Sequence, residues 1–241
     1  MAFTAQDVKA LREKTGVGMM ECKKALVEAD GDMDKAVDFL RERGLAAAAK
    51  KATRIAAEGV VLPYYDAQSK KGVVVEVNSE TDFVAKNEKF MNFVEGVAKT
   101  ILETNPADVE ALKEEKFDGT DRTVTETLND LVLSIGENMK VRRFERMDGI
   151  VSTYIHGGGS VGVMVGFDVA DESKAATPEF EAMGKNVAMQ IAAMSPAYLD
   201  EASVPAEVVE HEKTILAAQM KEDPKMASKP EAVLAKIAAG K

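Results

Sequence analysis

A glycine-rich segment from His156 to Gly162, with the sequence HGGGSVG, combines residue types that serve three kinds of chemistry. Its first four residues resemble the oxyanion loop of esterases, and Ser160 stands at the centre of a G-x-S-x-G pattern, the nucleophile elbow of serine hydrolases. Gly157, Gly159 and Gly162 also fit the G-x-G-x-x-G pattern that holds a dinucleotide pyrophosphate. The segment could therefore supply a nucleophile, an oxyanion hole or a phosphate-binding turn.

The sequence around this segment argues against all three. A nucleophile elbow and a dinucleotide fingerprint each need a strand before the motif and a helix after it, whereas a second strand pattern, VGVMVGFDV, follows here from Val161. Esterases also carry the oxyanion loop and the elbow on separate segments. We therefore predict a glycine-rich hairpin turn, and only ester turnover that disappears in Ser160→Ala would revive a hydrolase.

The remaining candidates for chemistry are few. Glu76 and Glu80 could act as an acid–base pair, but 30% of the residues are charged, and we predict a solvated surface for both. Cys22 stands among apolar residues of a helix pattern, which favours a buried small side chain over a nucleophile. One cysteine and two histidines leave little for a metal centre. We expect no catalytic residue, no metal and no cofactor.

An acidic charge balance and short apolar runs limit the classes of function further. The 241 residues carry 31 Lys and Arg against 41 Asp and Glu, a net charge of −10, so a nucleic-acid partner is not expected. The start, MAFTAQDVKA, lacks the basic and apolar regions of a signal peptide. The apolar runs are far shorter than the roughly 20 residues of a membrane span. We expect a cytoplasmic protein without membrane contact.

Three short helices are predicted in the first fifty residues. Thr4 and Asp7 form a capping pattern ahead of the first helix, and the glycines of 15–18 end it. A second helix carries Met19, Met20 and Cys22, Asp30-Gly31-Asp32 breaks it, and Gly44 can close a third. The Ala-rich and basic segment 45–59 is predicted to be a linker with high helix propensity.

An internal repeat organises the rest of the chain. At an offset of 90 residues an ungapped match pairs Gly59 with Gly149, Tyr64 with Tyr154, Gly72 with Gly162 and Phe90 with Phe180. Each copy is expected to form a strand, a turn, a strand and then, after an acidic loop, an amphipathic helix. The predicted elements are 60–66, 72–77 and 88–102 in the first copy, and 150–156, 161–169 and 178–194 in the second. Chance could pair the valines, but paired Gly, Tyr and Phe favour a duplication.

Two helices are expected between the copies, over 105–117 and 123–144, and a helical hairpin over 204–222 and 230–241. The predicted fold class is α+β, with two related antiparallel β/helix subdomains.

The segment 78–87, NSETDFVAKN, leaves a strand and enters a helix with an aromatic side chain among polar residues. Phe83 is either a hydrophobic staple tucked under the following helix, which the sequence favours, or an anchor presented to a partner. Met19 and Met20 allow the same two interpretations, core or docking surface.

Several segments together resemble bacterial translation elongation factor Ts. In chain order they are LREKTGVGMMECKKALVEADGDMDKAVDFLRERG, AAEG, EVNSETDFVAKNEKF, SIGENMKVRRF and MQIAAMSPAYL. The resemblance covers essentially the whole chain, and TGVGMMECKKAL and TDFVAKN are its most specific parts. It implies a guanine-nucleotide exchange factor that binds elongation factor Tu, in its GDP-bound and nucleotide-free states, and releases GDP so that GTP can load. No covalent bond changes, so no enzyme is implied.

The resemblance also implies functional residues. Thr81, Asp82, Phe83 and Val84 match the family loop that disturbs the magnesium and phosphate site of elongation factor Tu. In the family, the residue matching Phe83 enters an apolar pocket of the partner, with the one matching Asp82 alongside. Six further positions match partner contacts of the family: Met19, Met20, Lys23, Ile135, Gly136 and His156.

The domain organisation implied by the resemblance has four parts. Residues 1–54 are expected to form a ubiquitin-associated-like three-helix docking domain, 55–147 and 148–204 the two core subdomains, and 205–241 the helical hairpin. The hairpin is the expected place of any self-association. The family usually continues with a further C-terminal module, which a sequence ending at Lys241 is expected to lack. The alternative function is a non-catalytic adaptor that binds proteins through the first fifty residues only.

Overall fold

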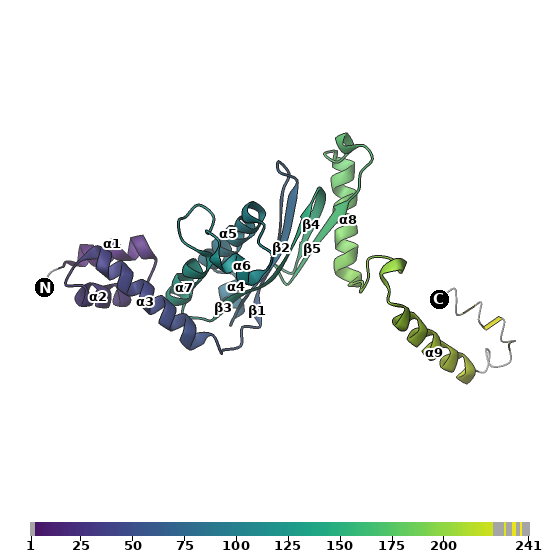
Figure 1. The fold of residues 1–241 in the computed structure, drawn as a ribbon, viewed down its shortest axis with the longest axis horizontal. Helices are drawn as coiled ribbons and strands as arrows, with labels where there is room; N and C mark the ends of the chain where they lie inside the picture. Colours follow the sequence, from purple (N-terminus) through teal and green to yellow (C-terminus); the bar gives the residue numbers. More distant parts are fainter. Residues whose placement is uncertain (1–2, 224–228, 230–232, 235–236, 238–241) are drawn as a thin grey trace. The chain divides into compact units, whose positions relative to one another are not determined.

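In the computed structural model, the described residues are 3–223, 229, 233, 234 and 237. The chain divides into two compact units, Met1–Ala193 and Met194–Lys241. Helices and two antiparallel sheets occur together in the first unit, which confirms the α+β class (Figure 1).

Three helices begin the first unit: α1 (Ala5–Thr15), α2 (Met19–Glu28) and α3 (Met33–Lys51). The capping box predicted at Thr4 and Asp7 is confirmed, and Gly16 ends α1 with a φ of +68°. The helices share a core of their own, which includes Leu11, Leu26 and Leu40. Cys22 is fully buried in this core, as predicted, and burial raises the pKa of its thiol.

The prediction that Gly44 closes the third helix is wrong. α3 continues through the Ala-rich segment to Lys51, because alanine has the highest helix propensity and no tertiary contact interrupts it. Gly44 is instead a packing position, where a Cβ atom would lie 3.4 Å from the carbonyl oxygen of Asn129. Its missing side chain lets α3 approach the helix that contains Asn129.

A three-stranded antiparallel sheet forms the centre of the first unit, in the order β1-β2-β3. Its strands are β1 (Glu58–Asp66), β2 (Lys71–Ser79) and β3 (Met139–Asp148). The helices that accompany it are α4 (Asp82–Ala85), α5 (Glu88–Thr104), α6 (Val109–Glu114) and α7 (Val124–Ile135). Valines of β2 and the apolar face of α5, including Phe90, Val97 and Ile101, are fully buried in one core.

The helix predicted over 123–144 is wrong in its second half. Gly136, with a φ of +91°, ends α7, and the chain enters β3 at Met139. Met139 and Val141 are buried while Lys140 and Arg142 are exposed, an alternation typical of a strand with one buried face.

The second copy of the repeat consists of β4 (Ile150–His156), β5 (Val161–Phe167) and α8 (Pro178–Met194). The strand, turn, strand and helix order predicted for both copies is confirmed, and α8 begins and ends 90 residues after α5. β4 and β5 form a separate two-stranded sheet. The glycines of the predicted hairpin turn, Gly157 to Gly159, all have positive φ, so that prediction is confirmed too.

The second unit contains α9 (Ala206–Glu222), which is the first helix of the predicted hairpin. The second helix, predicted over 230–241, lies outside the described residues apart from isolated positions. Two short 3-10 helices, Glu172–Lys174 and Glu201–Ser203, precede α8 and α9.

Candidate functional site

The segment that follows β2 is held by a carboxylate from the end of α7. The backbone N–H of Thr81 donates to Glu137 Oε2 at 3.0 Å, and the Thr81 hydroxyl donates to Glu137 Oε1 at 2.8 Å. Both carboxylate oxygens are therefore used to fix one residue, which sets where α4 begins.

A second set of contacts fixes the residue before it. Glu80 Oε1 accepts from the backbone N–H of Asn138 at 2.6 Å and from Arg54 at 3.4 Å. The Asn138 side chain in turn donates to the carbonyl oxygen of Arg54 at 2.8 Å. The chain after α3, the end of β2 and the start of β3 thus meet at one place.

The last part of the segment is fixed by its own residues. Lys86 donates to Asp82 at 2.9 Å, and this hydrogen bond together with the lysine's charge lowers the pKa of Asp82. Asn87 caps α5 by accepting from the N–H of Lys89. Residues 80–87 therefore form a tied loop, here named the α4 loop.

Phe83 lies at the tip of the α4 loop with 81% of its surface exposed, whereas Val84 is 5% exposed and belongs to the core. The staple interpretation, which the sequence favoured, is wrong. Successive residues of a helix point about 100° apart, so a four-residue helix buries one neighbour and exposes the other. An aromatic ring on a tied loop is the strongest single indication of a binding anchor in the described residues.

Ile135 and Gly136 lie beside this loop, because Glu137 follows them directly and binds Thr81. Ile135 is half-buried and packs on the core, while Gly136 is exposed. The structure therefore brings two predicted contact segments, 81–84 and 135–136, together.

Met19, Met20 and Lys23 lie on the exposed side of α2, and Met20 is 66% exposed. The core interpretation of the two methionines is wrong. The carbonyl oxygen of Gly16, just before α2, accepts from Lys89 at 2.8 Å and from the Ser134 hydroxyl at 2.8 Å. The start of α2 is thereby attached next to Ile135.

His156 is exposed at the end of β4, where Nδ1 is 3.1 Å from the Tyr154 hydroxyl. The glycine turn that follows lies against β1, since the N–H of Val61 donates to the carbonyl oxygen of Gly159 at 2.8 Å. The neighbouring start of β1 pairs with Ser79, just before the α4 loop. His156 therefore lies at the same end of the sheet as the α4 loop. Among the described hydrogen bonds, none joins His156 to the α4 loop directly.

Sequence reasoning missed the residues that hold the loop. Glu80 was expected to be a solvated side chain, but it ties β3 to the end of β2. Glu76 was expected to be solvated too, but it is 8% exposed and bonds to Arg142 and Arg143. Because the partners of Glu80 are 26 and 58 residues away, no local pattern could have indicated them.

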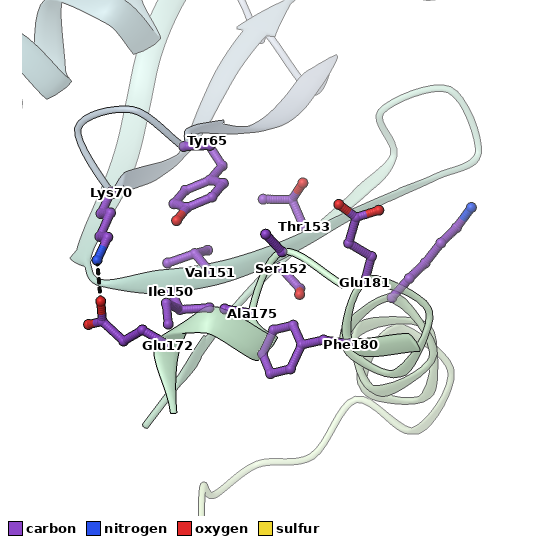
Figure 2. A pocket seen from close by; sticks show the side chains of 13 residues that line it. Tyr65, Lys70, Ile150, Val151, Ser152, Thr153, Glu172, Ala175, Phe180 and Glu181 are labelled. Atoms are coloured by element: carbon purple, nitrogen blue, oxygen red, sulfur yellow. Dashed lines mark hydrogen bonds and ion pairs between the residues drawn. The ribbon is translucent and has the colours of Figure 1, made fainter. Parts of the chain in front are cut away.

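A cavity of about 420 Å³ lies near the opposite end of the sheet, between the β1–β2 turn, β4 and α8 (Figure 2). Lys70 and Glu172 close one side with an ion pair of 2.6 Å, and the Tyr65 hydroxyl donates to the carbonyl oxygen of Gly149. Lys70 and Glu172 therefore neutralise each other at this edge of the cavity, and the backbone of Gly149 holds the Tyr65 hydroxyl.

Within the described part of the chain, no three His, Cys, Asp or Glu side chains are grouped as a metal ion requires. None of the helices found there has both the length and the apolar content to cross a membrane.

Comparison with known proteins identifies relatives along nearly the whole chain. A family model described as elongation factor TS matches residues 80–241. The elongation factor Ts of Clostridium perfringens is 52% identical over 242 residues, which covers 99% of this chain and 77% of that protein. The elongation factor Ts of Syntrophotalea carbinolica is 51% identical over 243 residues, covering 100% and 77%. That of Symbiobacterium thermophilum is 49% identical over 243 residues, covering 99% and 76%.

Proposed function

The chain belongs to the elongation factor Ts family, and from this premise we propose that it is a guanine-nucleotide exchange factor for elongation factor Tu. It binds the partner with GDP, promotes GDP release and passes through a nucleotide-free complex that GTP then resolves. The observation that carries the proposal is the 81% exposure of Phe83 on a loop that is held by Glu137 and by the buried side chain of Val84.

The mechanism exchanges one binding energy for another. Phe83 enters an apolar pocket of the partner, and burying such a side chain contributes about 1.5–3 kcal/mol. That energy displaces the partner groups that hold Mg²⁺ and the β-phosphate, with the Asp82 carboxylate alongside. Because coupling between two ligands is reciprocal, the factor by which this protein weakens GDP binding equals the factor by which GDP weakens binding of this protein. No covalent bond forms or breaks, so the protein acts without being an enzyme of covalent chemistry.

The tied loop favours this exchange physically. A free loop would lose conformational entropy when its anchor enters a pocket, whereas Thr81 and Val84 already fix the backbone around Phe83. The binding energy of the ring is then available to distort the partner.

The remaining partner contacts come from three further segments of the first unit. Met19, Met20 and Lys23 dock on the partner, Ile135 and Gly136 contact it beside the loop, and His156 contacts it from the glycine turn. Gly136 and the glycines after His156 let the partner backbone approach closely. We assign docking to a ubiquitin-associated-like domain of residues 1–54 and exchange to the subdomains 55–147 and 148–204.

The adaptor hypothesis is not favoured, because the family model matches residues 80–241 and not the first fifty. The proposed function places the protein in the cytoplasm, where elongation takes place, with a protein and not a nucleic acid as its partner. Self-association through residues 205–241 stays a prediction.

The test is release of a fluorescent GDP analogue from purified elongation factor Tu, followed by stopped flow. The chain should accelerate release in a saturable manner, and Phe83→Ala should reduce the acceleration about ten- to a hundredfold, the effect expected of a buried aromatic anchor. Ile215→Ala is the matched control, because Ile215 is an exposed apolar residue of α9 and lies outside the segments to which docking and exchange are assigned. A folded Phe83→Ala variant with normal exchange would contradict the mechanism.

A further inference from the structure

A groove of about 590 Å³ lies between the second half of α3, the helices α6 and α7, and the start of β3. These elements converge on one side of the first unit (Figure 1). Its floor is apolar and consists mainly of Ala48, Val124, Leu128, Val132, Met139 and Val141. We name it the α3–α7 groove. It does not contain any residue of the proposed exchange site.

One wall of the groove is a smooth apolar stripe on α3. Leu45, Ala48, Ala49 and Ala52 follow each other at helical spacing and line the same face. Leu45 is 58% exposed, and Ala49 and Ala52 are exposed as well. The stripe exists because α3 does not end at Gly44. Its small side chains leave room for another element to lie along the helix.

The rim of the groove carries three cationic side chains, and one of them has no ion pair to a residue that the structure describes. Lys113, Lys140 and Arg142 line it together with a single carboxylate, Glu110, although the whole chain has a net charge of −10. Lys113 is paired with Glu110 at 2.6 Å and Arg142 with Glu76 at 2.8 Å. Among the described residues, Lys140 has no carboxylate within 4.0 Å.

We propose that the α3–α7 groove binds an acidic amphipathic helix of a partner protein. The apolar floor and the α3 stripe take the apolar face of such a helix, in the way that helical peptides bind in grooves. The cationic rim pairs with carboxylates that flank this face, and it disfavours a basic helix. α3 and α7 are already packed at Gly44 and Asn129, so a third helix completes a common packing arrangement.

The test is fluorescence anisotropy with the full chain and a labelled synthetic peptide of about 16 residues. The peptide has leucine at every third or fourth position and glutamate on the remaining faces. Binding should be in the micromolar range and should weaken as salt is raised, because the rim charges are exposed. Leu45→Asp and Lys140→Glu should each weaken binding about tenfold. Ala49→Trp, which fills the groove and keeps every charge, should do the same.

Val27→Asp is the matched control, because Val27 is 54% exposed on α2 and does not line the groove. It should change the affinity less than about twofold, and thermal melts should show that all variants fold. Three results would overturn the proposal. The first is the absence of binding at millimolar peptide. The second is a peptide of the same composition with scrambled leucines that binds as tightly as the amphipathic peptide. The third is single-stranded RNA of the same charge that binds as tightly as the amphipathic peptide or more tightly.

Discussion

Two hydrogen bonds between Thr81 and Glu137 hold the loop that carries Phe83, the proposed binding anchor. Glu137 accepts both from the backbone and from the hydroxyl of Thr81, two positions before Phe83. Hydrogen bonds to an ionised group contribute more than neutral ones, and a bidentate arrangement also fixes orientation. Glu137 therefore positions Phe83 without touching the proposed partner pocket.

Glu137→Ala should lower the exchange efficiency about fivefold, because the α4 loop then loses entropy on binding that the native loop has already lost. Hydrogen exchange of residues 81–84 should become faster, while the free energy of unfolding should fall by only about 1–3 kcal/mol. Glu114→Ala removes an exposed carboxylate without a described ion pair and is the control. Unchanged exchange in a Glu137→Ala variant with a loosened loop would show that the tie is dispensable.

At the scale of elements, the most informative contact joins β2 to β3. The register shifts between Glu76 and Val77, so that Arg142 and Arg143 both lie opposite Glu76. Arg142 donates to its carboxylate at 2.8 Å and Arg143 at 2.7 Å. Burial opposes ionisation of Glu76, but the hydrogen bonds from Arg143, Asn78 and Arg142 outweigh it and lower its pKa.

The hydrogen bonds from Arg142 and Arg143 to Glu76 predict that the stability of the fold depends on pH. The pKa of Glu76 is lower in the folded than in the unfolded protein. The ionised carboxylate therefore contributes fully to the free energy of unfolding above the unfolded pKa of about 4.3. This contribution is lost as the pH falls through the lower pKa of the folded protein. Glu76→Gln should reduce the free energy of unfolding at pH 7 by about 1–2 kcal/mol.

Urea unfolding between pH 3 and 7 measures the effect. The difference in the free energy of unfolding between the wild type and Glu76→Gln should shrink below about pH 4.3. Glu145→Gln, on an exposed carboxylate of the neighbouring strand β3, should leave the pH profile nearly parallel to that of the wild type. If this difference in the free energy of unfolding stays constant down to pH 3, the pKa of Glu76 is not lowered as its contacts imply.

At the scale of the whole molecule, the two copies of the repeat are unequally covered. α5 and α8 each have 17 residues, but α5 buries nine of them and α8 only Gly184 and Ala188. The first copy has β3 beside β2, the helices α4 and α7 against α5, and α6 against α7 and β3. β4 and β5 pair only with each other among the described strands. Among the described residues, the second copy therefore repeats the elements of the first without a buried core of the same size.

Hydrogen exchange followed by mass spectrometry should reveal this difference. Amides of β2 and α5 should be protected close to the free energy of global unfolding, and those of β5 and α8 should exchange through smaller openings. The protection factors should differ by about a hundredfold or more, because few apolar contacts oppose a local opening of the second copy. Equal protection in both copies would show that they unfold as one unit.

Sequence patterns alone were enough to predict the capping box at Thr4 and Asp7, the glycine turn after His156, the repeat and the apolar face of α5. These features depend on residues close together in the chain or on a regular period, so their signal is local. The family, too, was identifiable from the segments around Met19 and Phe83, and the comparisons confirm it.

Sequence patterns did not reveal that Phe83 is exposed while its neighbour Val84 is buried, or that 139–148 is a strand. Only the tertiary structure decided that Glu76 and Glu80 bind distant partners. The free energy that settles these choices comes from contacts between residues tens of positions apart. Burial and pairing of this kind override local propensity, and a single sequence carries no period that records them.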